Sequence, residues 1–125
     1  MLLLLLSTAS SSFAGSATWK GNPATGDWNT ASNWSPATVP NGASDTSNFA
    51  TSNRTAVSLS ANTEVNGITF NAGASAFTIT AGPTFLLTLS GVGITNNSGT
   101  TQNFVAAGGT IQFINSATAD DNSSF

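Results

Sequence analysis

Few side chains in this 125-residue chain could do acid–base or nucleophilic chemistry. The sequence has no Cys and no His, so it lacks a thiolate, an imidazole base and the usual partner of a catalytic Ser. Apart from two acids near residue 120, its carboxylates are Asp27, Asp45 and Glu64, which follow one another at 18 and 19 positions. Coils of that length could align them, and a glycoside hydrolase needs two opposed carboxylates. Asp27 and Asp45 lie among turn residues, however, where Asx side chains usually bond the local backbone, so we expect no catalytic residues and no enzyme.

The three tryptophans, Trp19, Trp28 and Trp34, are the second candidate for chemistry. An indole offers a flat apolar face with a donor edge, which suits stacking against a sugar ring. The same three residues are also the large side chains available to fill a small core in their segment. The sequence therefore leaves two interpretations, a glycan-stacking platform or a packed interior, and favours the packed interior.

Two further patterns carry weaker signals. The tail Asp120-Asp121-Asn122 offers hard oxygen ligands for Ca²⁺ but lacks the Gly-rich nonapeptide of calcium-binding β-rolls, so we expect a solvated chain end. Acceptor patterns for N-glycosylation, expected by chance in so Asn- and Ser-rich a chain, begin at Asn33, Asn53, Asn96 and Asn122. We expect neither a metal nor another cofactor.

The amino-acid composition restricts the kinds of partner that this chain could bind. Charged residues are 6% of the chain, hydrophobic residues are 39%, and the net charge is −3. A chain this poor in cations has no basic stripe for nucleic acid and no attraction to anionic lipid. Because disorder goes with low hydrophobicity and high net charge, we expect one folded domain.

Short apolar clusters recur through the second half of the chain, most of them with two members two positions apart, which is the strand period. The predicted strands are 56–60, 67–71, 76–80, 85–90, 93–96, 102–105 and 110–115. Corresponding clusters lie about 20 positions apart, as in Val57 to Phe77, which predicts coils of about 20 residues stacked as a β-solenoid. An antiparallel β-sandwich would show similar strand spacing and remains the alternative.

Three parts follow one another along the chain. Residues 1–14 have an apolar run at Leu2–Leu6 and a small-residue ending, typical of an export signal cut after Ala14 or Ala17, although no Lys or Arg precedes the leucines. Residues 15–50 hold all three Trp and several turn residues, and we interpret them as a β cap over the end of the stack. Residues 51–125 form the repeat region, which we expect to be truncated at its C-terminus.

Beyond the pattern, several phrases of the sequence resemble bacterial autotransporter-associated β-strand repeat proteins. The resemblance covers roughly residues 17–119. It depends on Thr18-Trp19-Lys20-Gly21, Gly26-Asp27-Trp28-Asn29, Asn33-Trp34, Val39-Pro40, Asp45, Phe49, the run from Val65 to Phe70, and the run from Gly93 to Gln102. It implies a right-handed parallel β-helix that is exported and displayed at, or released from, the bacterial surface.

The leading prediction is thus an all-β chain that forms the solenoid stalk of a larger structural or adhesive surface protein. Its expected partners are surface glycans or copies of itself, with no nucleic acid, and with a membrane only through an anchor absent from this chain. The alternatives are the non-catalytic N-terminal part of a β-helical polysaccharide-degrading enzyme, or a carbohydrate-binding module.

Overall fold

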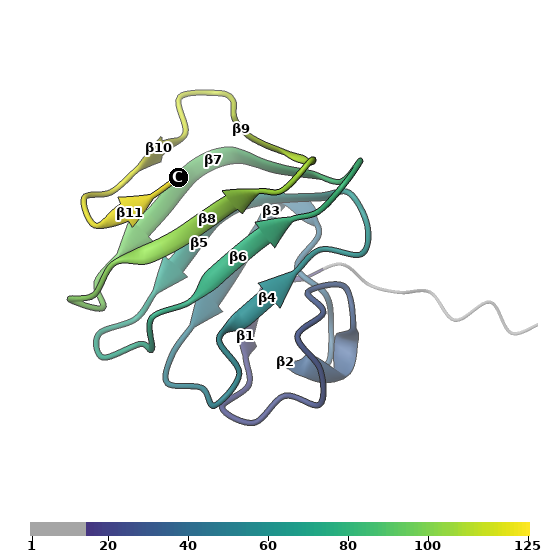
Figure 1. Ribbon diagram of the computed structural model, residues 1–125, viewed down its shortest axis with the longest axis vertical. Coiled ribbons are helices and arrows are strands. Elements are labelled where there is room, and N and C mark those ends of the chain that lie inside the picture. The colour runs from purple at the N-terminus through teal and green to yellow at the C-terminus, as the bar shows by residue number, and fades with distance from the viewer. Residues whose placement is uncertain (1–14) are drawn as a thin grey trace, which may run out of the picture.

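Strands stacked in parallel form the body of the molecule. The computed structural model describes residues 15–125, so the export signal predicted at residues 1–14 lies outside the described residues. Figure 1 shows the chain climbing from β1 and β2 at one end to β9, β10 and β11 at the other. The elements are β1 (Ala17–Trp19), the 3-10 turn η1 (Ala31–Asn33), β2 (Trp34–Ser35), β3 (Gly42–Phe49), β4 (Ala56–Ser58), β5 (Thr63–Phe70), β6 (Thr78–Ala81), β7 (Leu86–Asn96), β8 (Gln102–Ala106), β9 (Thr110–Phe113), β10 (Thr118–Ala119) and β11 (Ser123–Ser124). Within these residues no helix is long and apolar enough to cross a membrane.

Each coil presents three faces. One sheet has the order β10-β7-β5-β3-β1-β2, with β9 also paired to β7, and the other has the order β11-β8-β6-β4. The long strand β7 pairs with β9 through Leu86–Leu89 and with β10 through Gly93–Ile94. One face of this coil is thus the part of β7 that pairs with β9, the second is the part that pairs with β10, and the third is β8 in the other sheet. The stack comprises about three turns of a β-solenoid.

The pairing register identifies the architecture. Ser47 pairs in parallel with Ile68, 21 positions further on, and Ile68 pairs in parallel with Ile94, 26 positions further on. On the third face the corresponding steps are 22 and 25 positions. These parallel ladders confirm the predicted parallel β-helix and do not favour the antiparallel sandwich. The coils are longer than the 20 residues expected, because the connecting turns are longer than the apolar spacing indicates.

Side chains at paired inward positions form columns through the core. One column runs from Val57 through Ile79 to Phe104, and another joins Phe49 to Phe70, whose rings stack with centroids 5.2 Å apart. All five side chains are almost fully buried. Burying one such side chain stabilises a fold by about 1.5–3 kcal/mol, so the columns are the main source of cohesion between coils.

A bend in β7 explains the one clear difference in strand boundaries. The sequence predicts two strands, at 85–90 and 93–96, but the structure has a single strand over Leu86–Asn96. The register shifts where Asn66 of β5 faces the Gly91 region of β7, so the chain turns a corner without leaving the sheet. Gly93 has φ +94°, and a Cβ there would lie 2.0 Å from the Thr118 carbonyl oxygen. Gly93, the first residue of the second predicted strand, is thus required to be a glycine by the corner.

The Trp segment is continuous with the stack. In β1, Ala17 pairs in parallel with Ser47, and Asp27 forms a parallel bridge with Ser58. Strand β3, which also falls inside the segment, is a full member of the ladder through β5. The boundary expected at residue 50 therefore does not separate two structural units. The short strand β2 runs antiparallel to β1 and ends the larger sheet.

Candidate functional site

The tryptophans form the core of the β1–β2 end of the stack. Trp19 is 1% exposed, and Trp28 and Trp34 are 0% exposed. The Trp34 ring lies 5.1 Å from that of Trp19 and 5.0 Å from that of Trp28, both in edge-to-face geometry, and 5.5 Å from the Phe49 ring. No indole face is open to a sugar ring in this arrangement. The glycan-stacking interpretation therefore fails, because these side chains are the interior of the cap.

Hydrogen bonds fix the indoles in place. The Nε1 atom of Trp19 donates to the Arg54 carbonyl at 3.1 Å, that of Trp28 to the Pro40 carbonyl at 3.0 Å, and that of Trp34 to the Trp28 carbonyl at 2.6 Å. A buried indole N–H without an acceptor would be costly, and here each has one. The donors tie the aromatic cluster to the turns around it, which is a structural role.

Two of the three candidate acids accept hydrogen bonds from residues close to them in the sequence. In Asp27, Oδ1 accepts the backbone N–H of Asn29 at 3.1 Å and Oδ2 accepts the Thr30 hydroxyl at 2.6 Å. The Oδ2 atom of Asp45 accepts the backbone N–H of Asn41 at 3.2 Å. Asp27 thus makes the local Asx-type bond that its turn context predicts. Asp45 lies within β3 rather than in a turn, and its carboxylate reaches back to the turn before that strand.

The third acid, Glu64, differs from the other two. Its backbone N–H donates to the Asn41 side-chain oxygen at 3.0 Å, but its carboxylate makes no hydrogen bond to any residue within 15–125. Asn41 thus connects the backbone of Glu64 to the carboxylate of Asp45. Stacking of the coils thus places Asp45 and Glu64 on either side of Asn41, but only Glu64 lines the adjacent groove. Two carboxylates facing one substrate, as glycoside hydrolysis requires, are not found there.

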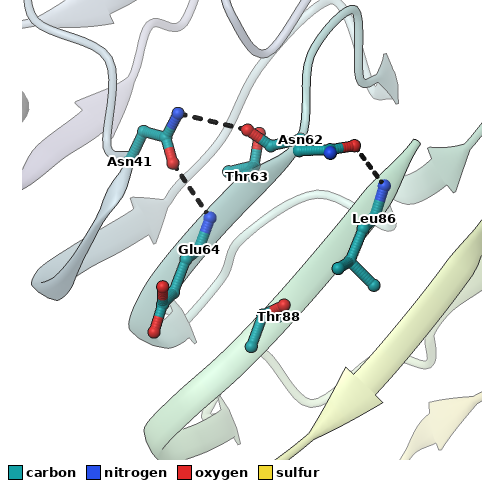
Figure 2. A pocket seen from close by; sticks show the side chains of 6 residues that line it. All are labelled: Asn41, Asn62, Thr63, Glu64, Leu86 and Thr88. Atoms are coloured by element: carbon teal, nitrogen blue, oxygen red, sulfur yellow. Dashed lines mark hydrogen bonds between the residues drawn. The ribbon is translucent and has the colours of Figure 1, made fainter.

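The groove beside Glu64 is the candidate site. It has a volume of about 240 Å³ on the outer surface of the stack, between the turn before β3 and strands β5 and β7 (Figure 2). Its lining residues are Asn41, Asn62, Thr63, Glu64, Leu86 and Thr88. Glu64 and Thr88 are register partners on adjacent strands, so their side chains point outward side by side.

Asparagine side chains hold the upper wall of the groove. Asn41 Nδ2 donates to the Asn62 carbonyl at 3.2 Å, and Asn62 Oδ1 accepts the backbone N–H of Leu86 at 3.0 Å (Figure 2). Each amide therefore reaches from one coil to the next. These bonds leave Asn62 Nδ2 without a partner among residues 15–125. The wall is therefore tied together by hydrogen bonds between coils, and it retains a donor without a partner.

The acidic tail is exposed to solvent, as the sequence predicts, and it is also part of the last coil. Asp120 Oδ2 accepts the backbone N–H of Asn96 at 3.0 Å, and the Asn122 carbonyl accepts the backbone N–H of Gln102 at 2.9 Å. Strands β10 and β11 flank these residues and pair in parallel with β7 and β8. In the described part of the chain, no three His, Cys, Asp or Glu side chains come together as a group that could hold a metal ion.

Two of the four asparagines in the glycosylation patterns have side-chain amides that are hydrogen-bonded within the fold. Asn33 is fully buried, and its Nδ2 donates to Thr25 Oγ1 at 2.7 Å and to the Asp27 carbonyl at 2.8 Å. Asn96 Nδ2 donates to the carbonyls of Thr100 and Asn122. Asn33 and Asn96 thus use their amides within the fold.

The sequence did not single out Asn41, Asn62, Leu86 or Thr88. One signal was present: Asn41 and Asn62 are 21 positions apart, which equals a coil step observed in the larger sheet. No protein-family model, curated protein or solved structure matches this chain.

Proposed function

We propose that this chain is a rigid structural segment of an exported bacterial surface protein, and that its outer faces make adhesive contacts. The observation that carries the proposal is the pair of continuous parallel ladders, β3-β5-β7 and β4-β6-β8. In such a stack, hydrogen bonds run along the axis from coil to coil, and apolar columns fill the centre. A rod built this way resists bending and local opening, as a stalk must.

The outer faces support the adhesive part of the proposal. Partly exposed residues that point outward from β5 and β7 include Glu64, Asn66, Thr69 and Thr95, and most carry amides or hydroxyls without charge. Neutral polar surface repeated along a rod suits many weak contacts that add up through multivalency. The resemblance to autotransporter-associated repeat proteins implies the same use.

For an exported chain, the start of the described fold favours cleavage after Ala14 over cleavage after Ala17. Ala17 is buried and paired in β1, and the Ser16 hydroxyl accepts the backbone N–H of Thr46 at 2.8 Å. Cleavage after Ala17 would remove both contacts, whereas cleavage after Ala14 would keep them. The mature chain is therefore proposed to begin at Gly15.

Expression in a Gram-negative host tests export directly. The full chain should leave the cytoplasm, and N-terminal sequencing of the exported product should begin at Gly15. The variant Ala14→Leu places a large residue at the cleavage position and should block processing. Ala9→Leu, the same change away from that position, should be processed normally. A chain that stays cytoplasmic and begins at Met1 would contradict export.

A further inference from the structure

We propose that the Glu64 groove binds a neutral saccharide. The inference rests on the adhesive function proposed above and assigns that function to one site. The groove, rather than the buried tryptophans, is the place where the outer surface offers unused hydrogen-bonding groups.

Acceptor and donor groups alternate along the groove. The Glu64 carboxylate can accept two or more hydrogen bonds and has no partner within residues 15–125. Asn62 Nδ2 can donate, because its companion oxygen is already held by the Leu86 N–H. Thr88 lines the groove with only 6% of its surface exposed; its hydroxyl accepts from Gln112 Nε2 at 3.0 Å, so its own hydrogen is left to donate. Adjacent sugar hydroxyls, each both donor and acceptor, match this order.

An apolar side chain completes the site. Leu86 is half-buried and lies on the same outward side of β7 as Thr88, two positions away. A sugar ring has C–H groups as well as hydroxyls, and a small apolar surface between fixed polar groups is the usual composition of a ligand pocket. The volume of about 240 Å³ is below the range of roughly 300–1,000 Å³ for drug-sized ligands, and it suits a small ligand such as a single sugar unit.

Charge selects a neutral ligand over an anionic one. None of the residues that line the groove is a cation, and Glu64 carries a negative charge that repels carboxylated or sulfated sugars. One carboxylate is also too few for a dedicated Ca²⁺ site, which takes six to eight oxygens. A polyol that offers O–H donors to Glu64 is the chemistry that remains.

The groove is preorganised, and its affinity should nevertheless be low. The amides of Asn41 and Asn62 fix its wall, and the register of β5 and β7 fixes Glu64 beside Thr88, so binding orders few groups. The site is open and small, and we expect a Kd on the order of 1 mM for a monosaccharide. Adhesion would then depend on repeated contacts along a glycan.

The test is a ¹H–¹⁵N NMR titration of the full chain with glucose, galactose, mannose and N-acetylglucosamine, each tried separately. At least one sugar should produce saturable shifts at the Asn62 side-chain amide and at the backbone amides of Glu64 and Thr88. Glu64→Gln removes the charged acceptor with little change of shape and should weaken binding roughly tenfold. Asp121→Asn removes the same charge from the β10–β11 turn and should leave binding unchanged.

A second variant and a competing ligand make the outcome decisive. Thr88→Val should also weaken binding while it keeps the side-chain shape, and thermal melts by circular dichroism show whether each variant is folded. The absence of groove shifts with every sugar, equal binding by Glu64→Gln, or a larger Glu64-dependent response to methylammonium than to any sugar would each overturn the proposal. A folded, exported chain that binds no sugar would reject this site alone. A chain that binds sugar but is not exported would reject the surface role and leave the site intact.

Discussion

The two ends of the described stack are packed differently: the end at β1 and β2, here called the closed end, has a buried aromatic cluster, and the end at β10 and β11, the open end, does not. At the β1–β2 end, Trp19, Trp28, Trp34 and Phe49 form a closed aromatic cluster, and the antiparallel strand β2 lies along the edge of the sheet. At the other end, the last coil consists of β9 and the two-residue strands β10 and β11. Phe125 stacks on Phe104 with ring centroids 5.4 Å apart, yet it is 66% exposed.

This difference indicates that the two terminal coils differ in local stability, although both belong to the same stacked core. In a repeat stack, each coil is stabilised by its own packing and by its contacts with the coils beside it. The aromatic cluster supplies those contacts at the β1–β2 end, whereas Ile111 and Phe113 are only partly buried in the last coil. Local opening should therefore begin at β10 and β11 and proceed toward the middle, since segments with few buried apolar contacts open first.

The largest expected effect comes from breaking the closed end. Trp34→Ala removes a fully buried indole that contacts three aromatic rings, and it should lower the free energy of unfolding by about 3–5 kcal/mol. Phe125→Ala at the open end removes a mostly exposed ring and should cost less than about 1 kcal/mol. Urea unfolding of both variants measures the contrast. Equal losses of unfolding free energy in the two variants would contradict the difference in packing between the two ends.

A pair of glutamines makes a smaller, sharper comparison. Gln102 is fully buried; its Oε1 accepts the backbone N–H of Phe77 at 2.8 Å, and its Nε2 donates to the Ser75 carbonyl at 3.1 Å. Gln102→Leu leaves the Phe77 N–H unpaired and should cost about 1–3 kcal/mol.

The matched variant is Gln112→Leu in the last coil. Gln112 is only partly buried and its side chain makes one hydrogen bond, to Thr88, so its replacement should cost less than about 1 kcal/mol. Chemical unfolding midpoints of both variants provide the measurement. A greater loss in Gln112→Leu would contradict the lower local stability expected at the open end.

Much of the fold was predictable because its core follows a simple period. Pairs such as Val57/Leu59 and Phe77/Ile79 mark inward positions of strands, and all four side chains are buried. The register was not predictable, because the steps between paired strands range from 21 to 30 positions and the sequence does not show which turns are long. For the same reason the burial of Thr88 was not predictable: it occupies an outward position of β7 but is only 6% exposed.

The smallest expected effect concerns a serine inside the core. Ser47 lies between Ala17 and Ile68 in a buried column, and its Oγ has no hydrogen-bond partner among the described residues. Ser47→Ala removes an unsatisfied hydroxyl and should leave stability unchanged or raise it by up to about 1 kcal/mol.

Ser90→Ala is the control for that change. Ser90 is also buried, but its Oγ donates to the Val65 carbonyl at 3.3 Å, so its replacement should lower stability by about 1 kcal/mol. Thermal melts compare the two alanine variants. A larger loss in Ser47→Ala than in Ser90→Ala would show that Ser47 has a partner in solution.

The candidate site was the least predictable part of the molecule. Glu64 stands out as one of three isolated acids, but its neighbours in the groove come from a turn, from the start of β5 and from the next coil. Their proximity follows from the pairing of Glu64 with Thr88, 24 positions further on, and thus from the register itself. The tryptophans, by contrast, were conspicuous in the sequence but do not form a site. They fill the interior of the closed end, where no ligand reaches them.

Cysteine cross-linking tests the parallel register, on which both the stalk and the groove depend. The chain has no native Cys, and Thr69 pairs with Thr95 on adjacent parallel strands, which lie about 4.8 Å apart. The double variant Thr69→Cys/Thr95→Cys should be joined rapidly by a short thiol cross-linker. The variant Thr69→Cys/Thr78→Cys, which joins strands of different sheets, should react far more slowly. An antiparallel hairpin of β5 and β6 would reverse this order, and that result would contradict the β-solenoid.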